Sequence, residues 1–172
     1  MKKYFLLFAA IMLIAGTSCQ QKVDIEKEKE AIMKVVQAES ETARNGDVDG
    51  LKSCYIQDEY NTRLNVGRES YNIITGWEQL GEMFGPFEEN AQGDFGNLII
   101  SKENAVIKVM GNTAWLICDN VWKGVVDGNE LKSDNIQITF LEKVDGAWKF
   151  SFAAWIVKPE PAAVTEETEA AQ

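Results

Sequence analysis

The chain of 172 residues contains no histidine and only three cysteines, Cys19, Cys54 and Cys118. Without histidine, the protein has no Ser–His or Cys–His nucleophile pair, no histidine general base and no His-liganded zinc site. The sequence also lacks glycine-rich phosphate loops, Walker motifs and paired carboxylates at a fixed spacing. We therefore expect no bound cofactor or metal, and few classes of catalysis remain open.

Two of the three cysteines lie among apolar neighbours, Cys54 beside Tyr55 and Cys118 beside Ile117. Outside the cytoplasm they could pair, and such a bridge would contribute several kcal/mol in the chain-entropy model. Disulfide geometry is demanding, however, and the apolar surroundings favour two buried, unpaired thiols.

Basic residues are scarce: 17 Lys and Arg stand against 27 Asp and Glu, which gives a net charge of −10. An electronegative surface repels nucleic acid and anionic lipid headgroups. We expect no nucleic-acid partner, and attachment to a membrane would depend on lipid chains rather than on basic residues.

The N-terminal apolar run, Tyr4–Ala15, is shorter than the roughly 20 residues that span a bilayer. Lys2 and Lys3 precede it, and the small residues Gly16–Ser18 lead to Cys19. This order is typical of a secretory signal peptide, and it resembles the lipobox of bacterial lipoproteins. The resemblance implies a signal peptide over 1–18, a lipid-carrying Cys19 and a bacterial cell-envelope location, facing the periplasm or on the outer membrane. The alternative is an ordinary signal peptide with a chance cysteine.

After a short tether over residues 19–23, apolar residues at helical spacing predict a helix over 24–44, ended by Asn45-Gly46. Asp47 is placed to cap a short second helix, and a third is expected from Trp77 to about Phe84. Glu39 falls on the apolar stripe of the first helix. Either it faces a polar pocket, or it lies at the edge of the stripe and reaches solvent.

From residue 97 onwards the pattern is one of strands separated by Gly-Asn and Asp-Gly turns, which are hairpin signals. Helices followed by hairpins predict an α+β fold, with the helices on one face of an antiparallel sheet. A single domain over 24–157 is expected. Residues 158–172, rich in Pro, Ala, Glu and Thr, are interpreted as a disordered acidic tail.

Alternation predicts which side chains share a face. We expect Phe140 to lie on the helix side with Ile136 and Ile138, and Phe152 to lie there with Trp148 and Phe150. The strand that starts at Thr113 is apolar on both faces, so its second face is expected to meet another copy of the protein; the alternative is that the tail or an end loop covers it. The candidates for this dimer face are Trp115, Ile117 and Val121.

Five short segments, taken in order, resemble the NTF2-like superfamily and, within it, the SnoaL-like and DUF4440 groups. These segments are residues 43–47, 55–58, 76–80, 111–114 and 143–149, and the resemblance covers roughly residues 24–157. It implies a cone formed by helices and a strongly curved antiparallel sheet, with a pocket at the open end and frequent dimerisation through the sheet.

Many members of the superfamily carry His residues where this chain has Phe152 and Ala154. The acid–base trio of the ketosteroid-isomerase branch also has no residue-by-residue match here. The catalytic alternative is therefore a SnoaL-like or ketosteroid-isomerase-like enzyme with Glu39, Asp58 or Asp134 as a carboxylate general base.

Asn120, Trp122 and Asp134 are expected to point inward near strand ends, where they would line a pocket mouth. The plainer alternative is a core aromatic residue with polar residues at its rim. The full set of pocket candidates is Glu39, Asp58, Tyr60, Asn120, Trp122, Asp134 and Phe152. Taken together, the sequence predicts a lipid-anchored, homodimeric NTF2-like domain that binds a small apolar or amphipathic ligand, or a partner protein, without catalysis.

Overall fold

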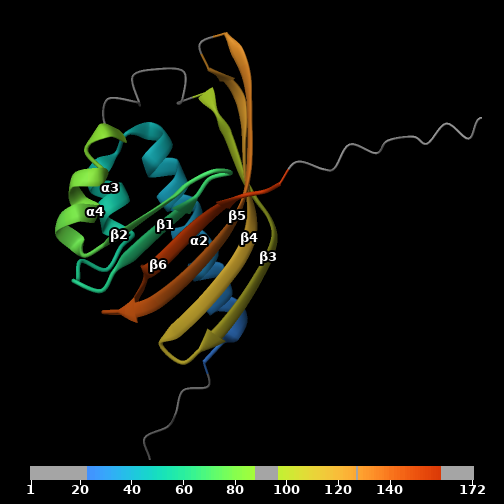
Figure 1. Cartoon of the computed structure of the whole chain (residues 1–172). Coiled ribbons are helices and arrows are strands. Elements are labelled where there is room, and N and C mark those ends of the chain that lie inside the picture. Colours follow the sequence, from blue (N-terminus) through green and yellow to red (C-terminus); the bar gives the residue numbers. More distant parts are fainter. Residues whose placement is uncertain (1–22, 88–96, 127, 160–172) are drawn as a thin grey trace, which may run out of the picture.

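The structure is a computed structural model that describes residues 23–87, 97–126 and 128–159. Its helices lie on one side of a long, curved sheet (Figure 1). The predicted signal peptide, with Cys19, lies outside the described residues, as does most of the predicted tail. Lys158 is described, and its ammonium forms ion pairs of 2.8 Å with Asp119 and with Asp134.

In the described residues, three helices form where the sequence predicts them, and side chains cap the first two. Helix α2 (Ile25–Asn45) is capped by Asp24, whose carboxylate accepts from the Lys27 N–H, and it ends at Gly46 in the left-handed conformation. Helix α3 (Val48–Ser53) is capped by Asp47, and helix α4 (Trp77–Met83) follows β2.

The sheet has six strands in the order β2-β1-β6-β5-β4-β3. Their bounds are β1 (Thr62–Val66), β2 (Tyr71–Thr75), β3 (Ile99–Met110), β4 (Thr113–Val126), β5 (Asn129–Val144) and β6 (Ala147–Val157). The hairpins from β3 to β6 confirm the meander expected from the turn signals. The α+β class is also confirmed. The expectation of a purely antiparallel sheet is wrong in one pairing, because β1 runs parallel to β6.

The predicted orientation of β5 is wrong. Phe140 is paired directly with Trp115, and Ile138 with Ile117. Directly opposed residues share a face, so Ile138 and Phe140 lie on the convex, helix-free face, as does Asp134 opposite Val121. The helix side of β5 instead carries polar Gln137 and Thr139, both fully buried. Alternation predicts the opposite because the apolar side chains of Ile138 and Phe140 lie on the convex face, while the buried face carries polar Gln137 and Thr139.

A bulge in β6 explains the second error of orientation. Phe140 pairs with Phe152, but the next β5 residue, Leu141, pairs with Phe150, so Ser151 is an extra residue on β6. A bulge of one residue reverses which face the following side chains occupy. Phe150 is therefore buried beneath the helices, whereas Phe152 lies on the convex face, 5.8 Å from the Phe140 ring.

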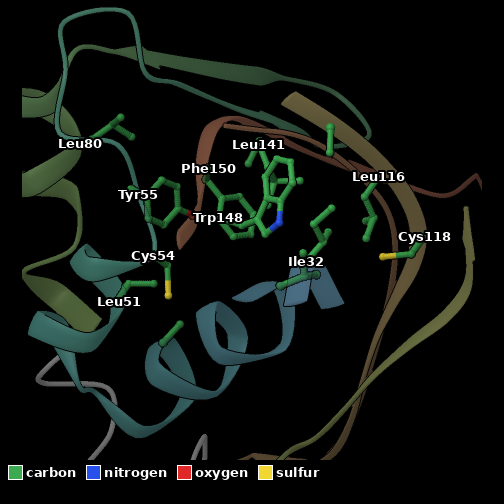
Figure 2. Packing of buried hydrophobic residues seen from close by; sticks show 14 of the residues in the cluster. Ile32, Leu51, Cys54, Tyr55, Leu80, Leu116, Cys118, Leu141, Trp148 and Phe150 are labelled. Atoms are coloured by element: carbon green, nitrogen blue, oxygen red, sulfur yellow. The ribbon is translucent and has the colours of Figure 1, made fainter. Parts of the chain in front are cut away.

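The hydrophobic core fills the space between the helices and the concave face of the sheet. Figure 2 shows Ile32 of α2 and Leu51 of α3 facing Leu116, Trp148 and Phe150 of the sheet. Burial of this apolar surface is the main source of stability. Cys54 and Cys118 both belong to the core and are unpaired, which confirms the expectation of two buried thiols.

The candidate dimer face is the convex face of the sheet. Val106, Ile117 and Phe140 lie there, and each exposes 40% or more of its surface. Trp115 is half-buried on the same face, opposite Phe140. Val121 shares this face but is buried, so it adds little exposed apolar surface.

Candidate functional site

A cavity of about 390 Å³ lies between the C-terminal end of α2 and the concave face of the sheet. Its lining combines aromatic and aliphatic side chains with amides and two arginines. The lining residues are Ala43, Arg44, Arg63, Asn65, Phe87, Asn120, Trp122, Leu131, Ser133, Asn135 and Trp155.

Strand register explains why these side chains meet. Asn120 is paired with Asn135, and Trp122 with Ser133, so all four lie on one face of the β4–β5 ladder. The pairing of β6 with the parallel strand β1 places Trp155 beside Asn65. Figure 1 shows the curved sheet with α2 on its inner side. Ala43 of that helix also lines the cavity.

Glu39 lies behind the cavity wall and holds Arg63 in place. Its carboxylate accepts from the Tyr55 hydroxyl at 2.9 Å and from the Ser40 hydroxyl at 3.1 Å. The Arg63 Nη1 lies 3.7 Å from the same carboxylate and donates to the Tyr55 oxygen at 3.3 Å. Glu39 is 3% exposed, so the solvent-facing alternative is wrong. A carboxylate with several donors and a cation nearby is the arrangement that makes burial of a charge tolerable.

Arg63 also stacks on an aromatic wall. Its Cζ lies 3.9 Å above the Trp155 ring, a cation–π geometry. The Arg63 Nε is buried and has no hydrogen-bond partner among the described residues. This guanidinium is therefore fixed by Glu39, Tyr55 and Trp155 while part of its donor capacity stays unused.

Lys102 forms a second polar centre, next to the cavity. Its ammonium donates to three neutral oxygens, at 2.7 Å to Ser40, 2.8 Å to Asn120 and 2.6 Å to Gln137. Asn120 also accepts from the Trp122 indole at 3.1 Å and thereby connects Lys102 to the cavity lining. Burial lowers the pKa of Lys102, while the nearby Glu39 carboxylate opposes that shift.

Ser40 contacts both polar centres, through Glu39 and through Lys102. In the described residues these centres carry more positive than negative charge, whereas the protein as a whole is acidic. Burial, followed by the Glu39 charge, raises the pKa of Tyr55 well above its ordinary value, so its hydroxyl stays a donor at neutral pH. Among the described residues, Arg63, Lys102 and Arg44 supply three cations to this site, against the single carboxylate of Glu39. The described part of the cavity lining contains no Asp or Glu.

The structure brings together only part of the predicted pocket set. Asn120 and Trp122 line the cavity as expected, and Glu39 lies one layer behind it. Phe152 and Asp134 point to the convex face, contrary to expectation, because of the bulge at Ser151 and the orientation of β5.

The remaining two candidates lie on the surface, away from the cavity. Asp58 precedes β1 in an exposed loop, where its carboxylate accepts from the Glu59 N–H at 2.6 Å. Tyr60 is half exposed, and its hydroxyl lies 3.5 Å from the Glu142 carboxylate.

Sequence reasoning missed Arg63, Lys102 and Trp155 as site residues. Lys102 lies within β3, which continues past it with a bulge between Glu103 and Val106. The alternation of Ile100 and Lys102 is a signal that could have placed Lys102 inward. A buried Glu39 also requires a cation from elsewhere in the chain, but nothing local identifies Arg63.

No group of three or more Cys, Asp or Glu side chains in the described residues is placed to hold a metal ion. No helix within that part of the chain is both long enough and apolar enough to cross a membrane.

Comparison with solved structures identifies the fold. An NTF2-like protein with a cystatin-like fold from Novosphingobium aromaticivorans matches with a TM-score of 0.64 and 15% identity, covering 81% of this chain and 87% of that one. The fold is NTF2-like. A protein of unknown function from Mycobacterium tuberculosis has a TM-score of 0.65 at 15% identity, covering 87% of this chain and 86% of its own.

A third structure of similar fold is the CaMKII hub of S. rosetta, with a TM-score of 0.58 and 14% identity, covering 75% of this chain and 95% of the hub. No protein-family model and no curated protein matches this sequence. At these identities, the likeness establishes the fold alone, so the function has to be argued from the site.

Proposed function

We propose that the protein is a lipid-anchored NTF2-like domain of the bacterial cell envelope, related to the SnoaL-like and DUF4440 groups, that binds a small amphipathic molecule without catalysis. The observation that carries the proposal is the cavity between α2 and the sheet. Apolar walls from Trp122, Leu131 and Trp155 surround a few fixed polar groups, chiefly Asn120 and Arg63. This combination is typical of small-molecule sites.

The positions of the candidate bases support binding over carboxylate acid–base chemistry. Asp58 lies in a surface loop and Asp134 on the convex face. Glu39 accepts hydrogen bonds from Tyr55 and Ser40, and it lies behind Arg63 rather than in the cavity wall. A general base has to reach the proton that it removes, and none of the three is placed to do so.

Ligand binding is tested on protein purified from membranes of its own host. Native mass spectrometry of the detergent-released protein should show a bound small molecule. The variant Leu131→Trp, which fills the cavity, should release it, whereas Val125→Trp, at an exposed position on the neighbouring strand β4, should not. Retention of the molecule by the Leu131→Trp variant would place the site elsewhere.

The lipid anchor depends on Cys19. We expect wild-type protein to incorporate an azide-labelled fatty acid and to fractionate with membranes, because lipid chains supply the attachment that an acidic domain lacks. The Cys19→Ala variant should lose the label, while Cys54→Ala should keep it. Labelling of the Cys19→Ala protein would exclude Cys19 as the lipidated residue.

The convex face is proposed as the contact between two copies of the chain. Its exposed apolar residues Val106, Ile117 and Phe140 support this reading, since patches of this kind mark interaction surfaces. A hub domain is among the proteins of similar fold.

A further inference from the structure

The cavity has a charge opposite to that of the protein around it. The chain carries a net charge of −10. Yet Arg44 and Arg63 line the cavity, Lys102 lies directly behind Asn120, and the described lining residues include no Asp or Glu. Charges lining a cleft with low-dielectric walls concentrate ions of opposite sign.

Among the described residues, the single carboxylate of Glu39 lies near two of these three cations, since its charge also favours the charged form of Lys102. Its carboxylate lies 3.7 Å from Arg63 Nη1. The partners of Lys102 are the neutral oxygens of Ser40, Asn120 and Gln137. Those of Arg44 are also neutral, namely the Leu98 carbonyl at 3.2 Å and the Asn45 amide oxygen at 3.1 Å. Because buried or partly buried cations are costly without counter-charge, the described part of the site can accommodate further negative charge.

Arg63 is the group best placed to receive that charge. Its side chain is 13% exposed, and it is fixed by Tyr55, Glu39 and the Trp155 ring. The buried Nε has no partner among the described residues. A guanidinium held in this way presents a planar edge that matches a carboxylate.

We infer that the cavity binds an amphipathic carboxylate, with its carboxylate at Arg63 and Arg44 and its apolar body against Trp122, Trp155 and Leu131. This inference rests on the proposed ligand-binding function and adds the chemical class of the ligand. Apolar walls and a volume of about 390 Å³ fit an aryl- or alkyl-substituted acid better than a small inorganic anion.

The test uses three probes of similar size: 4-phenylbutyrate, its neutral amide 4-phenylbutyramide, and 3-phenylpropyl phosphate. Each is titrated into the full chain in lipid nanodiscs with ¹⁵N-labelled tryptophan, and the indole signals of Trp122 and Trp155 are followed. We expect the carboxylate to bind about tenfold more tightly than the amide, a difference of about 1.4 kcal/mol, since hydrogen bonds to charged groups are stronger than those between neutral groups. Added salt should reduce this preference.

Variants locate the carboxylate. Arg63→Gln should lower carboxylate affinity about tenfold and leave amide affinity unchanged. Arg44→Gln should have a smaller effect of the same kind, and it keeps the test valid if Arg63→Gln does not fold, which the Trp148 indole signal and thermal unfolding would reveal. Lys123→Gln, an exposed change of equal charge on β4, should alter nothing.

Each outcome has a distinct meaning. Equal binding of acid and amide at Trp122 and Trp155 would overturn the inferred carboxylate site and leave the proposed ligand-binding function standing. Tighter binding of the phosphate would also overturn the carboxylate assignment. No shift of either indole signal with any probe would contradict both proposals.

Discussion

Tyr55 connects the hydrophobic core to the polar site. Its ring lies 5.1 Å from the ring of Phe84 and 5.0 Å from that of Phe150, and Figure 2 shows it beside Phe150. Its hydroxyl donates to Glu39 and accepts from Arg63. One side chain thus fixes the position of the guanidinium relative to the core.

Tyr55→Phe should lower the free energy of unfolding by about 2 kcal/mol, because it removes a hydrogen bond to a buried carboxylate. Urea denaturation measures the change. Tyr60→Phe is the matched control: the Tyr60 hydroxyl is exposed and lies at the 3.5 Å limit from Glu142, so its loss should be within about 0.5 kcal/mol of zero. Equal effects of the two substitutions would contradict a structural role for the Tyr55 hydroxyl.

The buried thiol of Cys54 makes the free energy of unfolding depend on pH in alkaline solution. Burial, and next the Glu39 carboxylate, raise the pKa of Cys54 from 9.0 to about 11. Between these values the unfolded chain releases the thiol proton and the folded protein keeps it, so stability falls as pH rises. We therefore expect the free energy of unfolding of wild type, relative to that of Cys54→Ala, to fall between pH 9 and pH 11. A constant difference across that range would show that the thiol ionises equally in both states.

At the scale of elements, the turn between α2 and α3 depends on Gly46, whose φ is 66°. Side chains with a Cβ are disfavoured in this left-handed region. Gly46→Ala should lower stability by about 1 kcal/mol, measured by urea denaturation.

The matched control is Gly81→Ala in the interior of α4. The nearest side-chain atom to an added Cβ there is Trp77 Cε2 at 4.0 Å, so the methyl group has room. We expect Gly81→Ala to raise stability by about 0.5–1 kcal/mol through helix propensity. A destabilised Gly81→Ala protein together with an unaffected Gly46→Ala protein would contradict both the requirement for glycine at position 46 and the helical role of position 81.

Elements with local signals could be predicted from the sequence. The caps Asp24 and Asp47, the helical spacing of apolar residues and the Asp145-Gly146 turn each depend on neighbours in the chain. The orientation of β5 and of the end of β6 could not be predicted in this way. The orientation of β5 follows from its pairing with β4, and that of the end of β6 from the Ser151 bulge; both are defined only by pairing with another strand.

The same distinction applies to the site. Glu39 stands out in the sequence because it interrupts an apolar stripe. Its partners Tyr55 and Arg63 come from other elements, and Lys102 reaches Ser40 from a position 62 residues further along the chain. Contacts of this kind follow from the folded topology, and a single sequence has no pattern that pairs them.

At the scale of the whole molecule, the convex face predicts self-association. Ile117→Lys places a charge in the middle of that apolar surface, next to Ile138 on β5. In sedimentation equilibrium, the wild-type protein should be a dimer and the Ile117→Lys protein a monomer, because desolvating an unpaired lysine disfavours the contact.

The control for this experiment is Ile25→Lys at the start of α2. Ile25 has a similar exposed fraction, 43% against 40% for Ile117, but lies on a helix rather than on the sheet. It should leave the dimer intact. A monomeric wild-type protein, or loss of the dimer in the Ile25→Lys protein, would argue against the convex face as the contact.

The bulge at Ser151 also restricts the ways in which this sheet can misassemble. Before it, Trp148 and Phe150 face the helices; after it, the inward residues are Ala153 and Trp155. A slip of β6 by one residue would expose aromatic residues on both sides of the bulge and turn Lys149 toward the core. No register shifted by one residue keeps the side chains of both halves of β6 on their native faces. The Ser151 bulge therefore disfavours other alignments of β5 and β6.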